Sequence, residues 1–143
     1  MRVALAEAAA AIGTGDVPVG AVILDADGVV VAQGRNRREA DADPTAHAEI
    51  VAMRAAARAR RSWRLEGLTL VVTLEPCTMC AGAITEARLS RLVFGAADPR
   101  AGAVGSLWDV VRDQRFVLVP EVVGGVLAAE CLKIIRTFFA ERR

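Results

Sequence analysis

Apolar residues recur at two different spacings along the chain, and these spacings divide it into helices and strands. Residues 2–12 are rich in alanine and end at Gly13-Thr14-Gly15, which predicts a first helix. Val19–Leu24 and Val29–Gln33 are short apolar runs on either side of a polar turn that ends at Gly28. Such runs around a turn of this composition are typical of a β-hairpin. We therefore expect the chain to open with a helix and two antiparallel strands.

A polar segment, residues 34–44, separates this hairpin from a second helix and is expected to be an exposed loop. Pro44 is a helix start signal, and an alanine- and arginine-rich run follows from Ala46 to about Arg60. The apolar positions of this run recur at helical spacing. We therefore expect a helix with His47 and Glu49 in its first turn.

The second half of the chain alternates apolar strands with helices. Leu68–Leu74 is apolar almost throughout, as expected for a central strand that is covered on both faces. Pro76 suits the first position of a helix that runs to about Arg88, which places Cys77 and Cys80 in its opening turn. The remaining elements are expected at Arg91–Phe94 (strand), residues 95–105 (loop), Leu107–Val111 (short helix), Phe116–Val119 (strand) and Val126 to the C-terminus (helix).

The order of these elements is a helix, a hairpin and then three strands that alternate with helices. It predicts an α/β fold of three layers (α/β/α), in which a mixed five-stranded sheet lies between helices. No repeat or linker divides the chain, so residues 1–143 are expected to form a single domain. In such folds ligands bind beyond the carboxyl edge of the sheet, where the helix tips carrying His47 and Cys77 would meet.

The composition shows that the chain is apolar without the pattern of a membrane protein. Its hydrophobic share is 54%, but no apolar run of about 18 residues is free of charge or glycine. The N-terminus lacks the basic and then apolar pattern of a signal peptide. We therefore expect a soluble, cytoplasmic protein.

Arginine dominates the basic residues, and Lys133 is the single lysine among the 18. The planar guanidinium can bind two phosphate oxygens at once, so arginine suits nucleic-acid recognition. A GC-rich genome produces the same bias without selection for nucleic acid, and the net charge is only +1. The candidates for phosphate contacts are Arg35, Arg37, Arg38, Arg142 and Arg143.

Four residues form the strongest chemical pattern in the sequence: His47, Glu49, Cys77 and Cys80. One imidazole and two thiolates are three ligands of a tetrahedral zinc, and they leave an open position for water. Glu49 follows His47 by two positions and is expected to transfer protons beside the metal. A zinc site of this kind indicates a hydrolase.

Two other interpretations of these residues remain open. Cys77 and Cys80 could form a redox dithiol, although thioredoxin-like motifs lie early in a chain and leave His47 and Glu49 unexplained. A closed structural zinc site would need Cys131 as its fourth ligand. Cys131 falls on the apolar stripe of the last helix, so we expect it to be buried and uncoordinated.

The spacing His-x-Glu followed by Pro-Cys-x-x-Cys is the known signature of zinc deaminases. Beyond this motif, the chain resembles the bacterial tRNA-specific adenosine deaminases, a branch of the cytidine deaminase superfamily, almost from end to end. The matching stretches are residues 17–22, 36–49, 73–83, 93–96 with Asp98, 105–107 and 138–139. The chain departs from the family at Ala97, where a basic residue often precedes the aspartate.

This resemblance implies a cytidine-deaminase-like fold and one zinc per chain, held by His47, Cys77 and Cys80, with Glu49 as the proton carrier. It implies that adenosine at the wobble position of a tRNA anticodon loop is hydrolysed to inosine with release of ammonia. The alternative is a relative in the same superfamily that deaminates a free nucleobase or nucleoside, such as guanine or cytosine.

The resemblance also implies the contacts with substrate. Asn36 would bind the flipped base, Asp98 would contact the neighbouring sugar, and the pocket walls would be Val17, Ala46 and Leu74. Family members are homodimers in which the partner subunit helps to form the RNA surface. We therefore expect tRNA and a second copy of this chain as partners.

Overall fold

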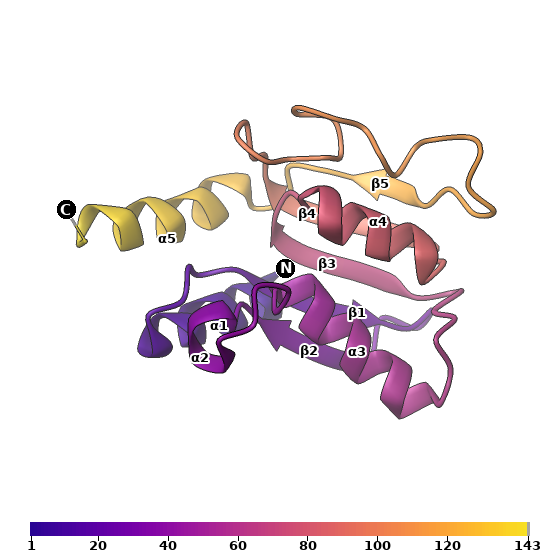
Figure 1. Ribbon diagram of the computed structural model, residues 1–143, viewed down its shortest axis with the longest axis horizontal. Helices are drawn as coiled ribbons and strands as arrows, with labels where there is room; N and C mark the ends of the chain where they lie inside the picture. The colour runs from indigo at the N-terminus through magenta and orange to yellow at the C-terminus, as the bar shows by residue number, and fades with distance from the viewer. Residues whose placement is uncertain (143) are drawn as a thin grey trace.

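Five strands between Gly20 and Val123 form one mixed sheet in the computed structural model, which describes residues 1–142 (Figure 1). The strands are β1 (Gly20–Leu24), β2 (Val30–Arg35), β3 (Thr69–Leu74), β4 (Arg91–Ala96) and β5 (Glu121–Val123), in the spatial order β2-β1-β3-β4-β5. β1 is antiparallel to β2 and β3, whereas β4 is parallel to both β3 and β5. All strands except β1 therefore end at the same edge of the sheet.

The helices connect these strands and extend beyond them. They are α1 (Arg2–Ala11) with a following 3₁₀ turn (Ile12–Thr14), α2 (Arg38–Asp41), α3 (Ala48–Arg60), α4 (Thr78–Glu86) and α5 (Ala128–Ala140). α5 extends past the ends of the strands and carries the C-terminus away from the sheet (Figure 1). Within residues 1–142, no helix has both the length and the apolar character needed to cross a membrane.

Alternating side chains of the strands build a core on each face of the sheet. Ile23 of β1 belongs to the larger cluster of buried residues, together with Ala52 of α3 and Ile84 of α4. Its neighbour Val22 packs in a second cluster with Ala4 of α1. Successive residues of a strand point to opposite faces, so one strand supports both helix layers. The predicted α/β/α fold with a mixed five-stranded sheet is confirmed.

Two glycines let helices approach the sheet closely. A Cβ at Gly34 of β2 would lie 2.6 Å from the backbone nitrogen of Ala52 in α3. A Cβ at Gly95 of β4 would collide with Cys131 Sγ in α5. These contacts exclude a side chain at either position, because protein interiors are already close-packed. Glycine thereby allows α3 and α5 to lie directly against the sheet.

The expected strand at Phe116–Val119 is wrong, because the fifth strand begins only after Pro120. Proline has no N–H to donate to a strand ladder, so pairing with β4 starts at the residue that follows it. The Phe116 amide instead donates to the Asp113 carbonyl at 3.2 Å, which makes it part of a turn.

The expected short helix at Leu107–Val111 is also wrong. The amides of Leu107 and Trp108 donate to the Gly102 carbonyl at 3.0 and 3.3 Å, and the Val110 amide donates to Ala103 at 3.0 Å. The segment therefore wraps around Gly102 and uses the donors that a helix would have needed.

Candidate active site

The sheet topology brings three possible metal ligands to one edge. α3 follows β2 after the segment that contains α2, and α4 follows β3 after three residues, so both helices come after strands that end at the same edge of the sheet. His47 immediately precedes α3, Cys77 immediately precedes α4, and Cys80 lies in the first turn of α4. His47 and Cys77 have an extended backbone, with ψ of 153° and 175°. They therefore lie one residue outside the helical turns in which the sequence placed them.

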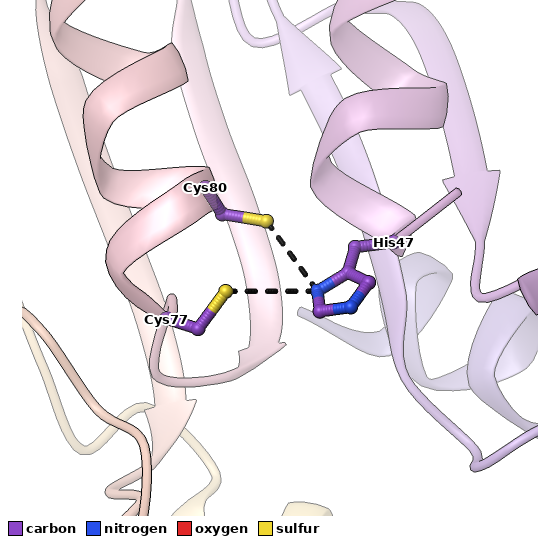
Figure 2. A group of neighbouring side chains, drawn as sticks. All are labelled: His47, Cys77 and Cys80. Atoms are coloured by element: carbon purple, nitrogen blue, oxygen red, sulfur yellow. Dashed lines mark hydrogen bonds between the residues drawn. The ribbon is translucent and has the colours of Figure 1, made fainter. Parts of the chain in front are cut away.

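The three side chains point toward one another from the two helix starts (Figure 2). His47 Nδ1 lies 3.7 Å from Cys77 Sγ and 3.6 Å from Cys80 Sγ, and the donor atoms all lie within 4.8 Å of one another. In a tetrahedral shell with Zn–N of about 2.0 Å and Zn–S of about 2.3 Å, the nitrogen-to-sulfur edge is about 3.5 Å. The donor set and its spacing therefore fit zinc and leave the fourth position for a further ligand.

The environment of this group favours a thiolate at Cys77. Hydrogen bonds from the Cys80 thiol and from His47 lower the pKa of Cys77 to about 3. The hydrogen bond to Cys77 and burial together raise the pKa of Cys80, and the hydrogen bond to Cys77 raises the pKa of His47. The thiolate is the form of cysteine that binds zinc, so Cys77 is already in the form that the metal needs, whereas Cys80 and His47 would give up a proton when the metal binds.

A turn before α3 sets the position of His47. Asp43 accepts hydrogen bonds from the amide and the hydroxyl of Thr45, at 2.8 and 2.7 Å. The Ala46 carbonyl accepts the Arg37 amide at 2.9 Å. Ala46 is buried and does not line the pocket that lies beside the three ligands. It therefore ties the His47 segment to the preceding loop through its backbone.

Glu49 lies in the first turn of α3 and is 4% exposed. Burial raises its pKa, because a less polar environment disfavours the charged carboxylate. Its carboxylate does not belong to the group of metal-ligating atoms found in residues 1–142. Glu49 lines the same pocket as His47 and Cys77, which suits a group that moves protons beside the metal.

A pocket of about 160 Å³ lies beside the three ligands. It is lined by Val17, Val19, Asn36, Arg38, His47, Ala48, Glu49, Leu74, Glu75, Cys77, Asp98 and Ala101. The structure thus brings together four of the five residues that the resemblance assigns to substrate: Val17, Asn36, Leu74 and Asp98. These residues come from the segment before β1 and from the ends of β2, β3 and β4, which share one edge of the sheet.

Asn36 serves both the backbone and the pocket. Its Nδ2 donates to the Val17 carbonyl at 3.1 Å, and its Oδ1 accepts the Arg38 amide at 3.3 Å. A primary amide has two N–H donors and two acceptor lone pairs, so one of each remains for a ligand. The side chain is 6% exposed and is held in one orientation by these two bonds.

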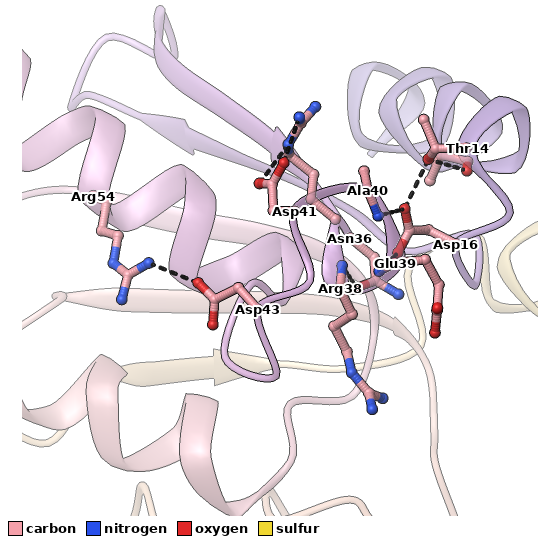
Figure 3. A network of polar contacts seen from close by, with 11 residues as sticks. Thr14, Asp16, Asn36, Arg38, Glu39, Ala40, Asp41, Asp43 and Arg54 are labelled. Carbon is pink, nitrogen blue, oxygen red and sulfur yellow. Dashed lines mark hydrogen bonds and ion pairs between the residues drawn. The ribbon is translucent and has the colours of Figure 1, made fainter.

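The segment that carries Asn36 is not wholly a loop as expected, because it contains α2 (Figure 1), and Figure 3 shows the polar contacts around it. Asp16 is fully buried and accepts the amides of Glu39 and Ala40 at 2.7 and 3.3 Å. Burial opposes its ionisation, but the hydrogen bonds from Thr14 and these amides lower the pKa of Asp16. Asp16 lies more than 20 residues before α2, so the sequence of α2 itself gives no sign of this interaction.

Glu75 is a pocket residue that the sequence reasoning missed. It follows β3, is 3% exposed and accepts hydrogen bonds from the amides of Asp98, Val104 and Ser106 at 2.9, 3.0 and 3.0 Å. Burial opposes ionisation, but the bonds from Ser106, Asp98 and Val104 lower the pKa of Glu75. The sequence offers one sign of its role, because Glu75 is a charged residue directly after an apolar strand.

A larger groove of about 1050 Å³ continues from the pocket toward α5. Both share Val17, Leu74, Asp98 and Ala101 as lining residues. The far part of the groove is lined by Arg100, Arg136, Phe139 and Arg142. Phe139 is a large apolar residue of α5, yet its side chain is 41% exposed. Arg100 and Arg136 are further residues that the sequence reasoning missed.

The arginines expected to contact phosphate differ in their surroundings. Arg35 pairs with Glu7 at 3.2 Å, and Arg37 pairs with Asp41 at 2.7 Å. Arg38 lines the pocket. Arg142 lines the groove, and its guanidinium lies 3.6 Å from the centre of the Phe138 ring. Arg143 lies outside the described residues.

Cys131 is fully buried in α5, as expected from its place on the apolar stripe. Its sulfur lies against Gly95 of β4 rather than with the three ligands. A closed site with four protein ligands therefore gains no support from the arrangement of residues 1–142.

Two helix starts that present a histidine and two cysteines beside a buried acid define a zinc-dependent hydrolase of the deaminase class. The family model for the zinc-binding region of cytidine and deoxycytidylate deaminases matches residues 1–96. The tRNA-specific adenosine deaminase of Haemophilus influenzae is 48% identical over 143 residues, which cover 100% of this chain and 83% of that protein. The chain belongs to the family of cytidine and deoxycytidylate deaminases, within the branch of the tRNA-specific adenosine deaminases.

Two solved structures show how far the similarity extends. A structure from work on A-to-I editing by tRNA:A34 deaminases has a TM-score of 0.89 and 45% identity, and the match covers 94% of this chain and 96% of that one. The guanine deaminase of Bacillus subtilis has a TM-score of 0.64 and 37% identity, with 67% of this chain and 61% of that one covered. The first match therefore covers nearly the whole of this chain, whereas the second covers two thirds of it.

Proposed function

We propose that this protein hydrolyses adenosine to inosine at the wobble position of a tRNA anticodon loop, in the cytoplasm. Residues 1–143 would act as one deaminase domain, since strands from both ends of the chain complete the sheet that carries the site. The observation that carries the proposal is the groove that continues from the pocket toward α5.

The groove has the chemistry of a binding surface for single-stranded RNA. Arg100, Arg136 and Arg142 supply positive charge along it, and the exposed ring of Phe139 offers a surface for stacking. Proteins that bind single strands combine these two features, because phosphates need cations and bases stack on aromatic rings. A base in the small pocket would thus remain joined to neighbouring nucleotides in the groove.

The residues of the pocket suit the proposed reaction. Zinc held by His47, Cys77 and Cys80 would supply Lewis-acid activation of a water molecule near neutral pH. Glu49 would accept a proton from this water and deliver it to a ring nitrogen of adenine, and it would later take the remaining proton of the hydroxyl added at C6 and pass it to the departing amine. Water adds its oxygen to C6, and the C6–N bond breaks to release ammonia. Asn36 would hold the base through its remaining amide donor and acceptor.

Deamination of a free base such as guanine is the second candidate, because the solved guanine deaminase shares 37% identity with this chain. A free base carries no phosphate and needs only the pocket of about 160 Å³. The groove with its three arginines would then have no role. The two functions therefore differ in whether phosphate contacts outside the pocket contribute to binding.

We expect the purified protein to produce inosine in its own tRNA pool and to leave free adenosine, guanine and cytosine unchanged. Replacing Arg100 and Arg136 together by Gln should weaken tRNA binding several-fold. A plot of the logarithm of the tRNA association constant against the logarithm of the salt concentration should also become less steep by about 1 to 2. Each lost phosphate contact reduces the steepness by roughly 0.7 to 0.9. Inosine mapping by sequencing and binding titrations at several salt concentrations measure these effects.

The matched control replaces Arg58 and Arg60 by Gln, since both are exposed on α3 and neither lines the groove. This pair should keep the wild-type salt slope. A protein that converts free guanine efficiently, ignores tRNA and shows no salt dependence would contradict the proposed substrate while leaving the zinc chemistry intact.

We further propose that the protein acts as a homodimer through the face formed by α3 and α4. An apolar hollow of about 550 Å³ lies between these helices, and it is lined mainly by Ile50, Met53, Ala57, Trp63, Leu65, Ala83 and Ala87. Trp63 lines this hollow and is 54% exposed. The same apolar patch on a second copy could cover it in a twofold arrangement.

Ala57→Glu should therefore convert the dimer to a monomer, because it places a charge in the centre of this face. Ala59→Glu is the matched control, since Ala59 is exposed on α3 and does not line the hollow. Sedimentation equilibrium measures both variants. Equal masses for the wild type and Ala57→Glu would contradict this interface.

A further inference from the structure

Glu75 is a buried carboxylate that the proposed chemistry does not use. It is 3% exposed and lies at the end of β3, two residues before Cys77. Its Oε1 accepts the amides of Val104 and Ser106, each at 3.0 Å. Its Oε2 accepts the amide of Asp98 at 2.9 Å and also the hydroxyl of Ser106. Four donors therefore converge on one side chain.

All four donors belong to the loop that follows β4, residues 97–106. The backbone of this loop closes around the carboxylate, and a Cβ at Gly102 would lie 2.5 Å from the Glu75 Cδ. The Ala103 amide also donates to the Pro76 carbonyl at 2.8 Å. Glu75 and its neighbour Pro76 thus tie the loop to the segment that carries Cys77.

The loop forms the wall shared by the pocket and the groove. Asp98 and Ala101 line both spaces, and Arg100 lines the groove. The Asp98 side chain is itself held, because its Oδ1 accepts the Arg100 amide at 2.9 Å. The bond from the Asp98 amide to Glu75 therefore sets where the Asp98 side chain meets the pocket.

We infer that Glu75 is a positioning residue for substrate, which holds the 97–106 loop so that Asp98 faces the sugar of the nucleotide in the pocket. This inference rests on the proposed function, because it assigns Asp98 to a nucleotide. Glu75 acts through the loop, because four donors of the loop occupy its two carboxylate oxygens.

The role requires a carboxylate rather than any polar side chain. An ionised carboxylate only accepts hydrogen bonds, and three of the four donors are backbone N–H groups that cannot reverse direction. In Glu75→Gln the amide nitrogen must face either the Asp98 amide or the amides of Val104 and Ser106. Two backbone amides face the position of Oε1, so the glutamine nitrogen favours the position of Oε2, beside the Asp98 amide. There the Ser106 hydroxyl can rotate and accept a hydrogen bond from it. The variant should therefore release Asp98 in particular.

The first test is amide hydrogen exchange in the wild type and in Glu75→Gln. We expect the Asp98 amide to be protected in the wild type and to exchange roughly 10- to 100-fold faster in the variant, as expected for loss of a hydrogen bond to a charged group. Zinc content and the amides of α3 should stay unchanged. An unprotected Asp98 amide in the wild type would overturn the inference, even if the variant failed to fold.

The second test separates positioning from a general structural role. With an anticodon stem-loop as substrate, Glu75→Gln should raise KM roughly 10- to 100-fold with little change in kcat, because uniform binding is lost. In an Asp98→Ala background the same substitution should add almost nothing, since the two residues act as one unit. Glu121→Gln is the matched control, because the Glu121 side chain is exposed and forms an ion pair with Arg91 on the surface.

Losses from Glu75→Gln and Asp98→Ala that simply multiply would overturn the inference, as would an unchanged KM. A wild type without activity on the stem-loop would instead refute the proposed function. The exchange experiment would still report whether Glu75 holds the loop, so the two failures can be told apart.

Discussion

Glu49→Gln should leave one zinc per chain and lower kcat by about 10²- to 10⁴-fold. Glu49 is buried in the pocket beside His47 and Cys77, and its carboxylate is not a member of the group of metal-ligating atoms found in residues 1–142. Glutamine keeps the size of the side chain but cannot carry a proton between water and base. Metal analysis by mass spectrometry and an ammonia-release assay measure the two effects.

The matched control is Glu130→Gln, which makes the same chemical change at an exposed position of α5. It should retain wild-type activity and zinc. Loss of zinc together with activity in Glu49→Gln would show that Glu49 is a ligand, and the proposed proton transfer would then be wrong.

Cys77→Ser should lose both zinc and activity, and excess zinc should not restore them. The three donor atoms lie at the spacing of a tetrahedral shell, so replacing one sulfur removes a third of the protein ligands. Chelation of zinc from the wild type should likewise abolish activity, which added zinc should restore. The stoichiometry of bound zinc and the rate of ammonia release are the measurements.

Cys131→Ser is the matched control, because it changes the same atom at a site away from the ligands. It should keep zinc and most of its activity. Cys131 is fully buried against Gly95, so the variant should lose about 1 to 2 kcal/mol in the free energy of unfolding, the usual cost of burying a hydroxyl. Zinc loss in Cys131→Ser would instead indicate a closed structural site.

Local patterns in the sequence predicted the elements that hold the site. β1 and β3 appear as short apolar runs because sheets covered on both faces need apolar side chains throughout. The starts of α3 and α4 follow from Pro44 and Pro76, and the distinct chemistry of histidine and cysteine marks the metal ligands. Each of these signals lies within a few residues of the feature it predicts.

The tertiary structure decided the features that depend on distant partners. α2 forms where the carboxylate of Asp16 accepts the amides of Glu39 and Ala40. β5 begins after Pro120, where the chain pairs with the edge of β4. Glu75 became a pocket residue only when the loop after β4 closed around it, and the groove exists because α5 lies beside that loop. Periodicity and motif spacing reflect only interactions between residues that are close together in the sequence. Hydrogen bonds and grooves between remote segments depend on how the whole sheet brings those segments together.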